Sequence, residues 1–192
     1  MVTKVMSSDA YLKELLRRYQ ANFDIYENYT VGSETYPAYA WFHSFSEKYV
    51  LRKEAQLWAI KAYEHVFFIK EMELTLELLD EYKRRITEEI EPELVRKGEK
   101  YPEKDHMCSY ITFVVLTDKA PSKEVQSAVK KFSFDKGYMF NFRGHSEAHF
   151  ISADMETGSV YTNKGGKNQR EMLEDVFRKL KNGDASSEPY AC

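Results

Sequence analysis

The chain has 192 residues, of which 43% are hydrophobic and 31% are charged. This composition is typical of a globular chain of one domain, or of two small ones, and it excludes disordered and collagen-like proteins. Lys and Arg number 28 and Asp and Glu number 31, and the resulting net charge of −3 argues against a dedicated nucleic-acid-binding protein.

The first third of the chain predicts a helix followed by strands. An apolar stripe with a 3.6-residue period predicts a helix over residues 9–23. A loop around residues 31–35 precedes strand-like stretches at residues 36–50 and 57–69, which are dense in aromatic residues. Periodicity leaves a helix open as the competing interpretation of residues 53–65.

The middle of the chain predicts a second helix and a central strand. Apolar residues at steps of four predict a helix over residues 72–90, which Pro92 kinks or divides before it ends near Lys97. Residues 99–105 are polar and form the best candidate for an internal linker. Residues 107–116 are β-branched and aromatic on both faces, which is typical of a central strand.

The last third predicts a short helix, three strands and a final helix. Pro121 or Ser122 opens the short helix. The strands are expected at residues 137–142, 148–153 and 159–162, and a hairpin turn that ends in a glycine joins the last two. The final helix is expected from about residue 168 to residue 180.

These elements predict a single α+β domain over residues 1–182, with about four helices on one face of a largely antiparallel sheet. Residues 183–192 have little apolar surface to bury, so we predict a flexible C-terminal tail. Residues 42–50 loosely echo residues 142–151, and two pseudo-repeated strand–strand–helix units are therefore an alternative description of the same fold.

Aromatic residues are unusually dense between residues 19 and 50. Tyrosine buries a ring while its hydroxyl stays in water, so tyrosines favour interfaces and ligand pockets. A core built from packed rings explains the same density, and both interpretations stay open. The candidate ligand-binding residues are Tyr26, Tyr29, Tyr36, Tyr39, Trp41 and Tyr49.

His145, Glu147 and His149 form an alternative metal site. Alternate residues of a strand point the same way, which would align two imidazoles with a carboxylate. Strand residues two apart lie ~6.6 Å from one another, however, which is awkward for one ion. A polar edge that faces solvent is the competing explanation, and we expect no metal or cofactor.

Glu47 and Glu64, together with Asp24, are candidate paired carboxylates for a metal-dependent hydrolase or nuclease. A nuclease core of this kind needs a Glu-x-Lys signature on a strand, whereas the one such sequence here, at residues 81–83, falls in a predicted helix. Solvated surface charges explain the same residues.

The sequence before the last helix is a candidate anion-binding loop made of Lys164, Gly165, Gly166 and Lys167. Backbone N–H groups of a Gly-Gly turn can cradle an anion, and the two lysines would add charge. The geometry of a strand-to-helix connection also needs glycines, and this is the competing explanation.

Three stretches resemble an uncharacterised prokaryotic family, a domain of unknown function. They are FHSFSEKYVLRK at residues 42–53, LWAIKAYEH at residues 57–65 and ETGSVYTNKGG at residues 156–166. The resemblance covers most of the chain. It implies a bacterial or archaeal cytoplasmic protein, and it brings no activity, cofactor or catalytic residue with it.

We therefore predict a cytoplasmic, non-catalytic module that uses its aromatic surface to bind a small molecule or a protein partner, with a homodimer as one assembly. No run approaches the ~20 apolar residues that span a bilayer, and the two cysteines suit a reducing compartment, so we predict no membrane partner. A metal-dependent hydrolase or nuclease remains the alternative.

Overall fold

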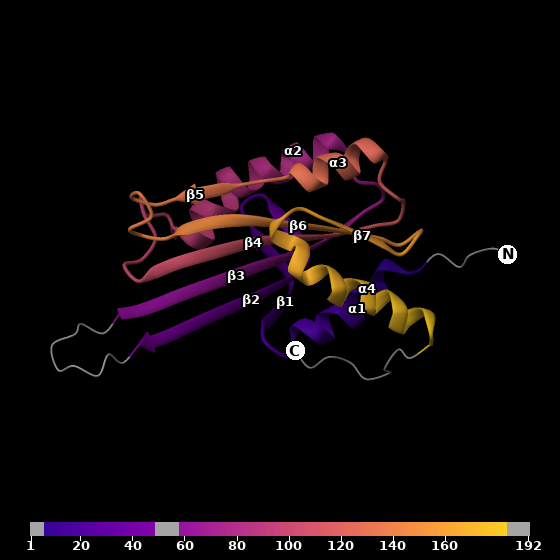
Figure 1. Cartoon of the computed structure of the whole chain (residues 1–192), viewed down its shortest axis with the longest axis horizontal. Coiled ribbons are helices and arrows are strands. Elements are labelled where there is room, and N and C mark those ends of the chain that lie inside the picture. The colour runs from indigo at the N-terminus through magenta and orange to yellow at the C-terminus, as the bar shows by residue number, and fades with distance from the viewer. Residues whose placement is uncertain (1–5, 49–57, 184–192) are drawn as a thin grey trace.

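The computed structural model describes residues 6–48 and 58–183, and for residues 45–48 and 58–60 it describes the backbone alone. Helices and strands follow one another along the chain as Figure 1 shows. The elements are α1 (Ser8–Tyr19), β1 (Asp24–Val31), β2 (Glu34–Lys48), β3 (Trp58–Glu71), α2 (Leu76–Arg85), the π-helix η1 (Ile86–Val95), β4 (His106–Thr117), α3 (Lys123–Lys131), β5 (Asp135–Gly137), β6 (His145–Asp154), β7 (Ser159–Thr162), the 3₁₀ helix η2 (Gly165–Gln169) and α4 (Arg170–Lys181).

The strands form one seven-stranded mixed sheet in the order β1-β2-β3-β4-β6-β5, and β7 pairs with β6 beside this path. The pairs β3–β4 and β4–β6 are parallel, and the other four pairs are antiparallel. Parallel neighbours need a crossover, which α2 with η1 supplies for the first pair and α3 for the second. The predicted α+β fold, with a largely antiparallel sheet and four α-helices, is confirmed.

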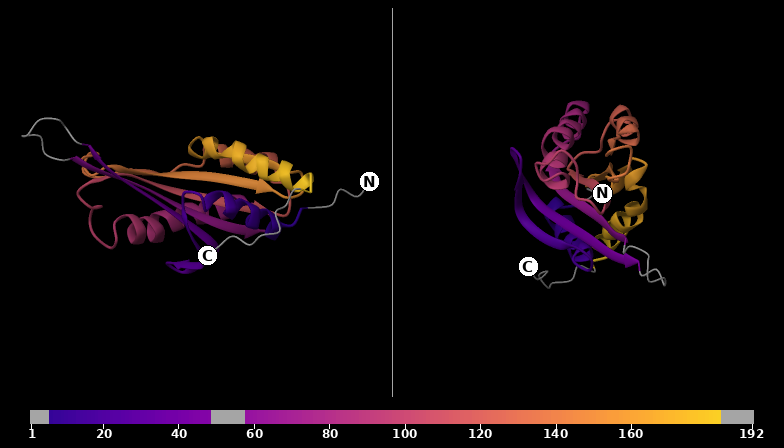
Figure 2. Two further views of the ribbon diagram at one scale, coloured as in Figure 1. Left: turned by 90° about the horizontal axis from the view of Figure 1, so that it is seen from below. Right: turned by 90° about the vertical axis from the view of Figure 1, so that its left-hand side faces the viewer.

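Helices cover both faces of this sheet, so the expectation of one covered face is wrong (Figure 2). One apolar layer lies between the sheet and α2, η1 and α3, and a second lies between the sheet and α1 and α4. Phe67 and Phe68 are adjacent on β3 and both fully buried, because they point into opposite layers. Strands that are buried on both faces read as continuous apolar runs.

Several predicted boundaries are confirmed with small shifts. Residues 58–71 form β3, which excludes the competing helix for residues 58–65, whereas residues 53–57 lie outside the described residues. The divided helix exists as α2 and η1, with Pro92 inside η1. Ser122 caps α3 by accepting a hydrogen bond from the N–H of Val125, and Gly158 closes the predicted hairpin with φ 76°.

Two predicted segments are wrong. The helix expected over residues 9–23 ends at Tyr19, and residues 24–31, for which no strand was predicted, form β1. Of the strand expected at residues 137–142, only Gly137 is in a strand, the three-residue β5, because Met139, Phe140 and Asn141 have left-handed backbone with φ of 50°, 52° and 67°. Consecutive left-handed residues cannot continue a strand.

Candidate functional site

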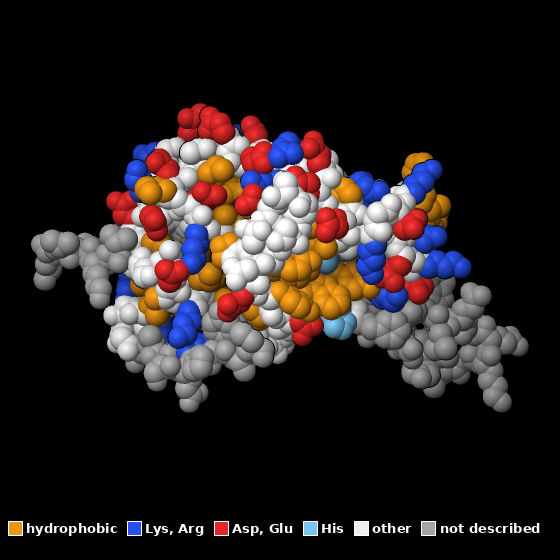
Figure 3. Space-filling model, turned by 180° about the vertical axis from the view of Figure 1, so that it is seen from behind, with side chains coloured by type: hydrophobic (Ala, Val, Ile, Leu, Met, Phe, Trp, Pro, Cys, Tyr) orange, Lys and Arg blue, Asp and Glu red, His pale blue; other side chains and the backbone are white. Residues whose placement is uncertain are grey.

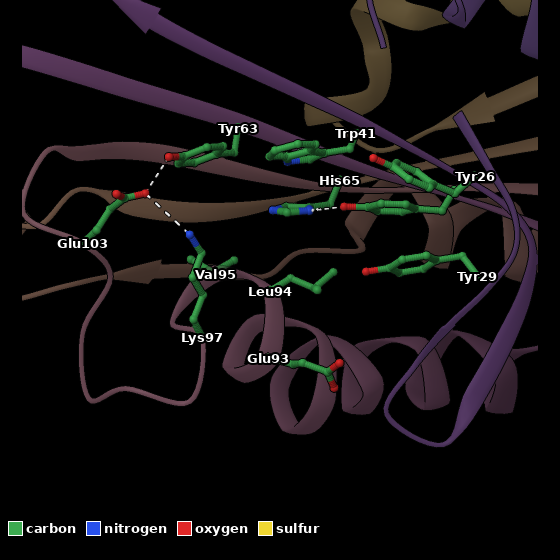
Figure 4. A pocket seen from close by; sticks show the side chains of 11 residues that line it. Tyr26, Tyr29, Trp41, Tyr63, His65, Glu93, Leu94, Val95, Lys97 and Glu103 are labelled. Atoms are coloured by element: carbon green, nitrogen blue, oxygen red, sulfur yellow. Dashed lines mark hydrogen bonds and ion pairs between the residues drawn. The ribbon is translucent and has the colours of Figure 1, made fainter. Parts of the chain in front are cut away.

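A pocket of about 370 Å³ lies between the sheet and η1 (Figure 4). Small-molecule sites usually have volumes of ~300–1,000 Å³, so a small ligand fits this space. Three strands, η1 and the loop after η1 contribute its walls. The lining residues are Tyr26, Tyr29, Tyr39, Trp41, Tyr63, His65, Glu93, Leu94, Val95, Lys97 and Glu103.

Strand alternation places most of the rings on one face of the sheet. Tyr39 and Trp41 are two apart on β2, and Tyr63 and His65 are two apart on β3. In the antiparallel register, Trp41 lies opposite His65. Side chains that are opposite one another or two apart share a face, so these four form one aromatic surface.

A local irregularity in β1 adds the remaining two rings. Tyr26 and Tyr29 are three apart, and regular alternation would place them on opposite faces. Between them Asn28 has a left-handed φ of 51°, and the pairing of β1 with β2 skips Asn28 and Pro37 while the register stays the same on both sides. This irregularity turns Tyr29 onto the pocket side, where its ring stacks on Tyr39 with centroids 4.0 Å apart.

Tyr39 and His65 form an uncharged polar pair inside the aromatic surface. The Tyr39 hydroxyl and His65 Nδ1 are 2.7 Å apart. Burial, with smaller contributions from Lys97 and His106, lowers the pKa of His65 to about 4, and burial raises the pKa of the Tyr39 hydroxyl. Figure 4 shows the second ring nitrogen of His65 pointing into the pocket. This nitrogen can donate or accept a hydrogen bond, depending on the tautomer.

An ionised carboxylate closes one end of the pocket. Glu103 accepts a hydrogen bond of 2.5 Å from the Tyr63 hydroxyl and another from Lys61, and Lys97 Nζ lies 3.9 Å away. Burial raises the pKa of Glu103, but the hydrogen bonds from Lys61 and Tyr63 outweigh it and hold the pKa below its usual range. Glu103 therefore fixes the loop after η1 against β3.

The wall opposite the sheet comes from η1, where the chain departs from α-helical hydrogen bonding. The N–H of Arg96 donates to the carbonyl of Glu91, five residues back, which is the hydrogen bond of a π-helical turn, and Pro92 lies inside η1. Leu94 and Val95 supply the apolar part of this wall, and Glu93 accepts a hydrogen bond of 3.2 Å from the N–H of Gly32. The pocket thus has an apolar middle and polar groups at both ends.

Of the six aromatic residues singled out in the sequence, Tyr26, Tyr29, Tyr39 and Trp41 line this pocket. Tyr36 does not. It is buried in the core, 4.8 Å from Phe67 between ring centroids, because the irregularity beside Pro37 directs it under α2. Tyr49 lies outside the described residues.

Sequence reasoning missed Tyr63 and His65, although they continue the alternation of the predicted strand over residues 57–69. It also missed Leu94, Val95 and Glu93, for which the sequence gives no signal, because their place depends on how η1 packs against the sheet.

The candidate carboxylates lie apart from the pocket. Glu64 points to the opposite face of the sheet, where it accepts hydrogen bonds of 2.7 Å from both Thr112 and Gln169. Glu47 lies on β2 opposite Ala59, and its side chain is outside the described atoms. Asp24 begins β1 and is exposed.

The alternative metal trio does lie on alternate positions of β6, but the structure does not converge it on one point. His149 Nε2 is 4.0 Å from Glu147 Oε1, and the imidazole stacks on Tyr110. Over residues 6–48 and 58–183, no three His, Cys, Asp or Glu side chains are close enough to hold a metal ion. The spacing along an extended strand keeps such side chains apart.

The glycines of the candidate anion-binding loop serve close packing. A Cβ on Gly166 would lie 2.8 Å from Ile151 Cγ1, and a Cβ on Gly165 would lie 2.2 Å from His149 Cδ2. The N–H of Gly166 donates to Asn163 Oδ1 at 2.9 Å, so it is not open to an anion. Lys164 and Lys167 are exposed on either side.

Comparison with known proteins gives one match. A protein-family model described as a domain of unknown function (DUF8052) matches residues 7–175. Neither a curated protein nor a solved structure matches the chain. Within the described ranges, no helix is long and apolar enough to cross a membrane.

Proposed function

The chain belongs to the DUF8052 family, a domain of unknown function, and from this premise we propose that it is a module that binds a flat, largely apolar small molecule in the pocket between the sheet and η1. One face of the ligand would stack on the ring of His65, beside the stacked rings of Tyr29 and Tyr39. Its other face would meet Leu94 and Val95.

The parallel orientation of the rings is the observation that carries this proposal. The planes of Tyr29 and Tyr39 differ by 14°, and those of Tyr39 and His65 differ by 20°. Aromatic rings prefer offset stacking, so parallel side chains beside an apolar wall favour a flat guest over a round or extended one. Figure 4 shows Tyr39 and His65 edge to edge in one layer, with Tyr29 below Tyr39 and Leu94 below His65.

The polar groups support binding more than catalysis. Tyr39 and His65 are hydrogen-bonded to each other, and Tyr63 is hydrogen-bonded to Glu103. Groups that are already paired orient a ligand well, and a few fixed polar groups in an apolar pocket are typical of specific small-molecule sites. The free edge of His65 and the hydroxyl of Tyr29 would select a ligand with hydrogen-bonding atoms on its rim.

A ligand screen tests the proposal. We expect at least one of indole, quinoline, adenine and riboflavin to raise the melting temperature of the full chain and to bind saturably in isothermal titration. Tyr29→Ser and Leu94→Asp each remove one wall of the slot. A lost stacking partner is worth about 1.4 kcal/mol, so each change should weaken binding about tenfold.

Tyr110→Leu is the matched control, because Tyr110 is a half-buried ring on the opposite face of the same sheet. It should bind the same compound as the unchanged protein does. The proposal fails if no compound stabilises the chain, or if Tyr29→Ser and Leu94→Asp bind as tightly as the control.

A further inference from the structure

The loop between β5 and β6, residues 138–144, holds two phenylalanines in solvent. Phe140 is 98% exposed and Phe142 is 85% exposed, and Met139 beside them is 44% exposed. Single exposed apolar residues are common, whereas neighbouring large ones mark interaction sites. This loop, called here the 138–144 loop, is the place where the predicted strand over residues 137–142 is wrong.

The backbone of the 138–144 loop is well ordered by hydrogen bonds and unfavourable in its torsion angles. The N–H of Tyr138 donates to Gly144, the N–H of Arg143 donates to Tyr138, and the N–H of Phe142 donates to Met139, all at 3.0–3.1 Å. Residues other than glycine disfavour left-handed backbone. Met139, Phe140 and Asn141 adopt it in succession, and none of the three is compensated by burial of its side chain. Strain of this kind clusters at functional sites.

The base of the loop is fixed to the core. The Tyr138 hydroxyl donates to the buried carboxylate of Glu91 at 2.7 Å and lies 2.8 Å from Ser146 Oγ. Glu91 also accepts hydrogen bonds of 2.8 Å from Lys136 and Arg96. The tip is therefore presented on a rigid support, which lowers the entropy lost when it docks.

Charged side chains of both signs surround the tip. Asp135 and Lys136 precede the loop, and Arg143 lies within it. Arg143 Nη1 donates to the carbonyl of Pro102 at 3.1 Å, which places alongside it a segment that carries the exposed side chains of Lys100 and Lys104 and those of Glu99 and Asp105. In Figure 3, basic and acidic side chains lie among hydrophobic ones at the end of the molecule where β5 lies.

We propose that the 138–144 loop docks the protein on an anionic lipid surface, with Phe140 and Phe142 entering the interface. A convex tip of two rings offers too little area for a flat protein interface, whereas a lipid interface accommodates a protruding ring. The exposed Lys100 and Lys104, together with Arg143, can pair with negative lipid headgroups, whereas Lys136 is paired with Glu91. The sequence predicts no membrane partner because it lacks a spanning segment, which interfacial docking does not need. The strand expected at residues 137–142 would also have placed both rings in a sheet.

Vesicle sedimentation with the full chain tests this inference. We expect binding to vesicles of phosphatidylglycerol and phosphatidylcholine in equal parts, and weaker binding to phosphatidylcholine alone. Each buried Phe contributes enough apolar surface for about a tenfold change in partitioning, so Phe140→Ser combined with Phe142→Ser should reduce binding about a hundredfold. Both side chains are exposed, and the melting temperature should stay unchanged.

Two further variants sharpen the test. Met72→Ser changes an exposed apolar residue elsewhere, at 66% exposure, and should bind as the unchanged chain does. Lys104→Glu should weaken binding several-fold, and added salt should remove that difference. Equal sedimentation with and without vesicles, or unchanged binding by the double phenylalanine variant, overturns the inference. A third outcome also overturns it: no vesicle binding, together with self-association in sedimentation velocity that the double variant abolishes. In that case the loop docks on a second copy of the chain.

Discussion

His65 shows how strongly a single position is set by its surroundings. Its side chain is 5% exposed, its Nδ1 is occupied by the Tyr39 hydroxyl, and it lies within the fields of Lys97 and His106. Burial disfavours the imidazolium, and both neighbours add to this effect when they are charged. The ring is therefore neutral wherever the fold is intact near neutral pH.

The low pKa of His65 predicts that stability falls on mild acidification. In the unfolded chain the pKa is about 6.5, whereas in the fold it is about 4, so the unfolded state binds more protons between these values. The contribution of neutral His65 to the free energy of unfolding is fully present above about pH 6.5. It is lost as the pH falls toward about 4, by up to about 3 kcal/mol. Urea unfolding from about pH 7 to about pH 4.5 measures this slope.

Two variants isolate the contribution of His65. His65→Phe should flatten the slope between about pH 6.5 and about pH 4.5, because no imidazole has to be kept neutral. His43→Phe should leave the slope in place, because His43 is exposed. Identical slopes in both variants would assign the pH dependence to other groups.

Gly166 is a second position that is constrained by its surroundings, because close packing leaves no room for a side chain. Its φ is not left-handed, yet a Cβ would lie 2.8 Å from Ile151 Cγ1 and 2.9 Å from the carbonyl oxygen of Phe150. Gly166→Ala should therefore destabilise the protein by about 1–3 kcal/mol through overpacking. Gly98→Ala is the contrast, because nothing lies within 4 Å and only its φ of 79° opposes alanine. A neutral Gly166→Ala in urea unfolding would refute the close packing of η2 on β6.

Among the elements, β1 depends on one residue for its role in the pocket. Asn28 adopts φ 51°, and asparagine tolerates this region better than most residues. Asn28→Gly should keep both stability and ligand binding, whereas Asn28→Val should cost about 1–2 kcal/mol and turn Tyr29 away from the pocket. Calorimetric melting and the titration with the best screened compound measure the two effects. Equal binding by both variants would contradict the role of the irregularity.

The elements that could be predicted from the sequence are those with a clean hydrophobic period. α1 and α2 carry such a period, and β4 was predicted from its continuous apolar run. β1 was missed because it is an edge strand with mostly exposed side chains, so its sequence shows no apolar alternation. The 138–144 loop was mistaken for a strand because its aromatic residues imitate alternation, and the left-handed torsions of three ordinary residues leave no signature.

The pocket, too, could be predicted from the sequence only in part. Its rings on β1 and β2 were visible in the sequence as aromatic density, and those on β3 were visible as alternation. Its opposite wall was not, because a π-helical turn changes which residues of η1 face the sheet. The local sequence pattern predicts which secondary structure a residue favours. The walls of a pocket, in contrast, depend on contacts between segments that are distant in the sequence.

At the scale of the whole molecule, one sheet separates two apolar layers. Strands β3, β4 and β6 contribute residues to both layers, as Phe113 and Val114 do on β4. Each layer is closed by a different pair of α-helices, α2 with α3 and α1 with α4. Neither layer has a sheet of its own, so the loss of one exposes the central strands that the other needs.

This shared sheet predicts that the molecule unfolds as one cooperative unit, as expected for a single domain over residues 1–182. Leu15→Ala creates a cavity in the layer under α1, and Phe113→Ala creates one in the layer under α2. Each should cost about 2–5 kcal/mol. In native-state hydrogen exchange, either change should lower the protection of α1, α2 and β4 by the same free energy, because all three open only by global unfolding. If Leu15→Ala lowered protection in α1 and α4 alone, the two layers would be separate folding units and the sheet would stand without its second cover.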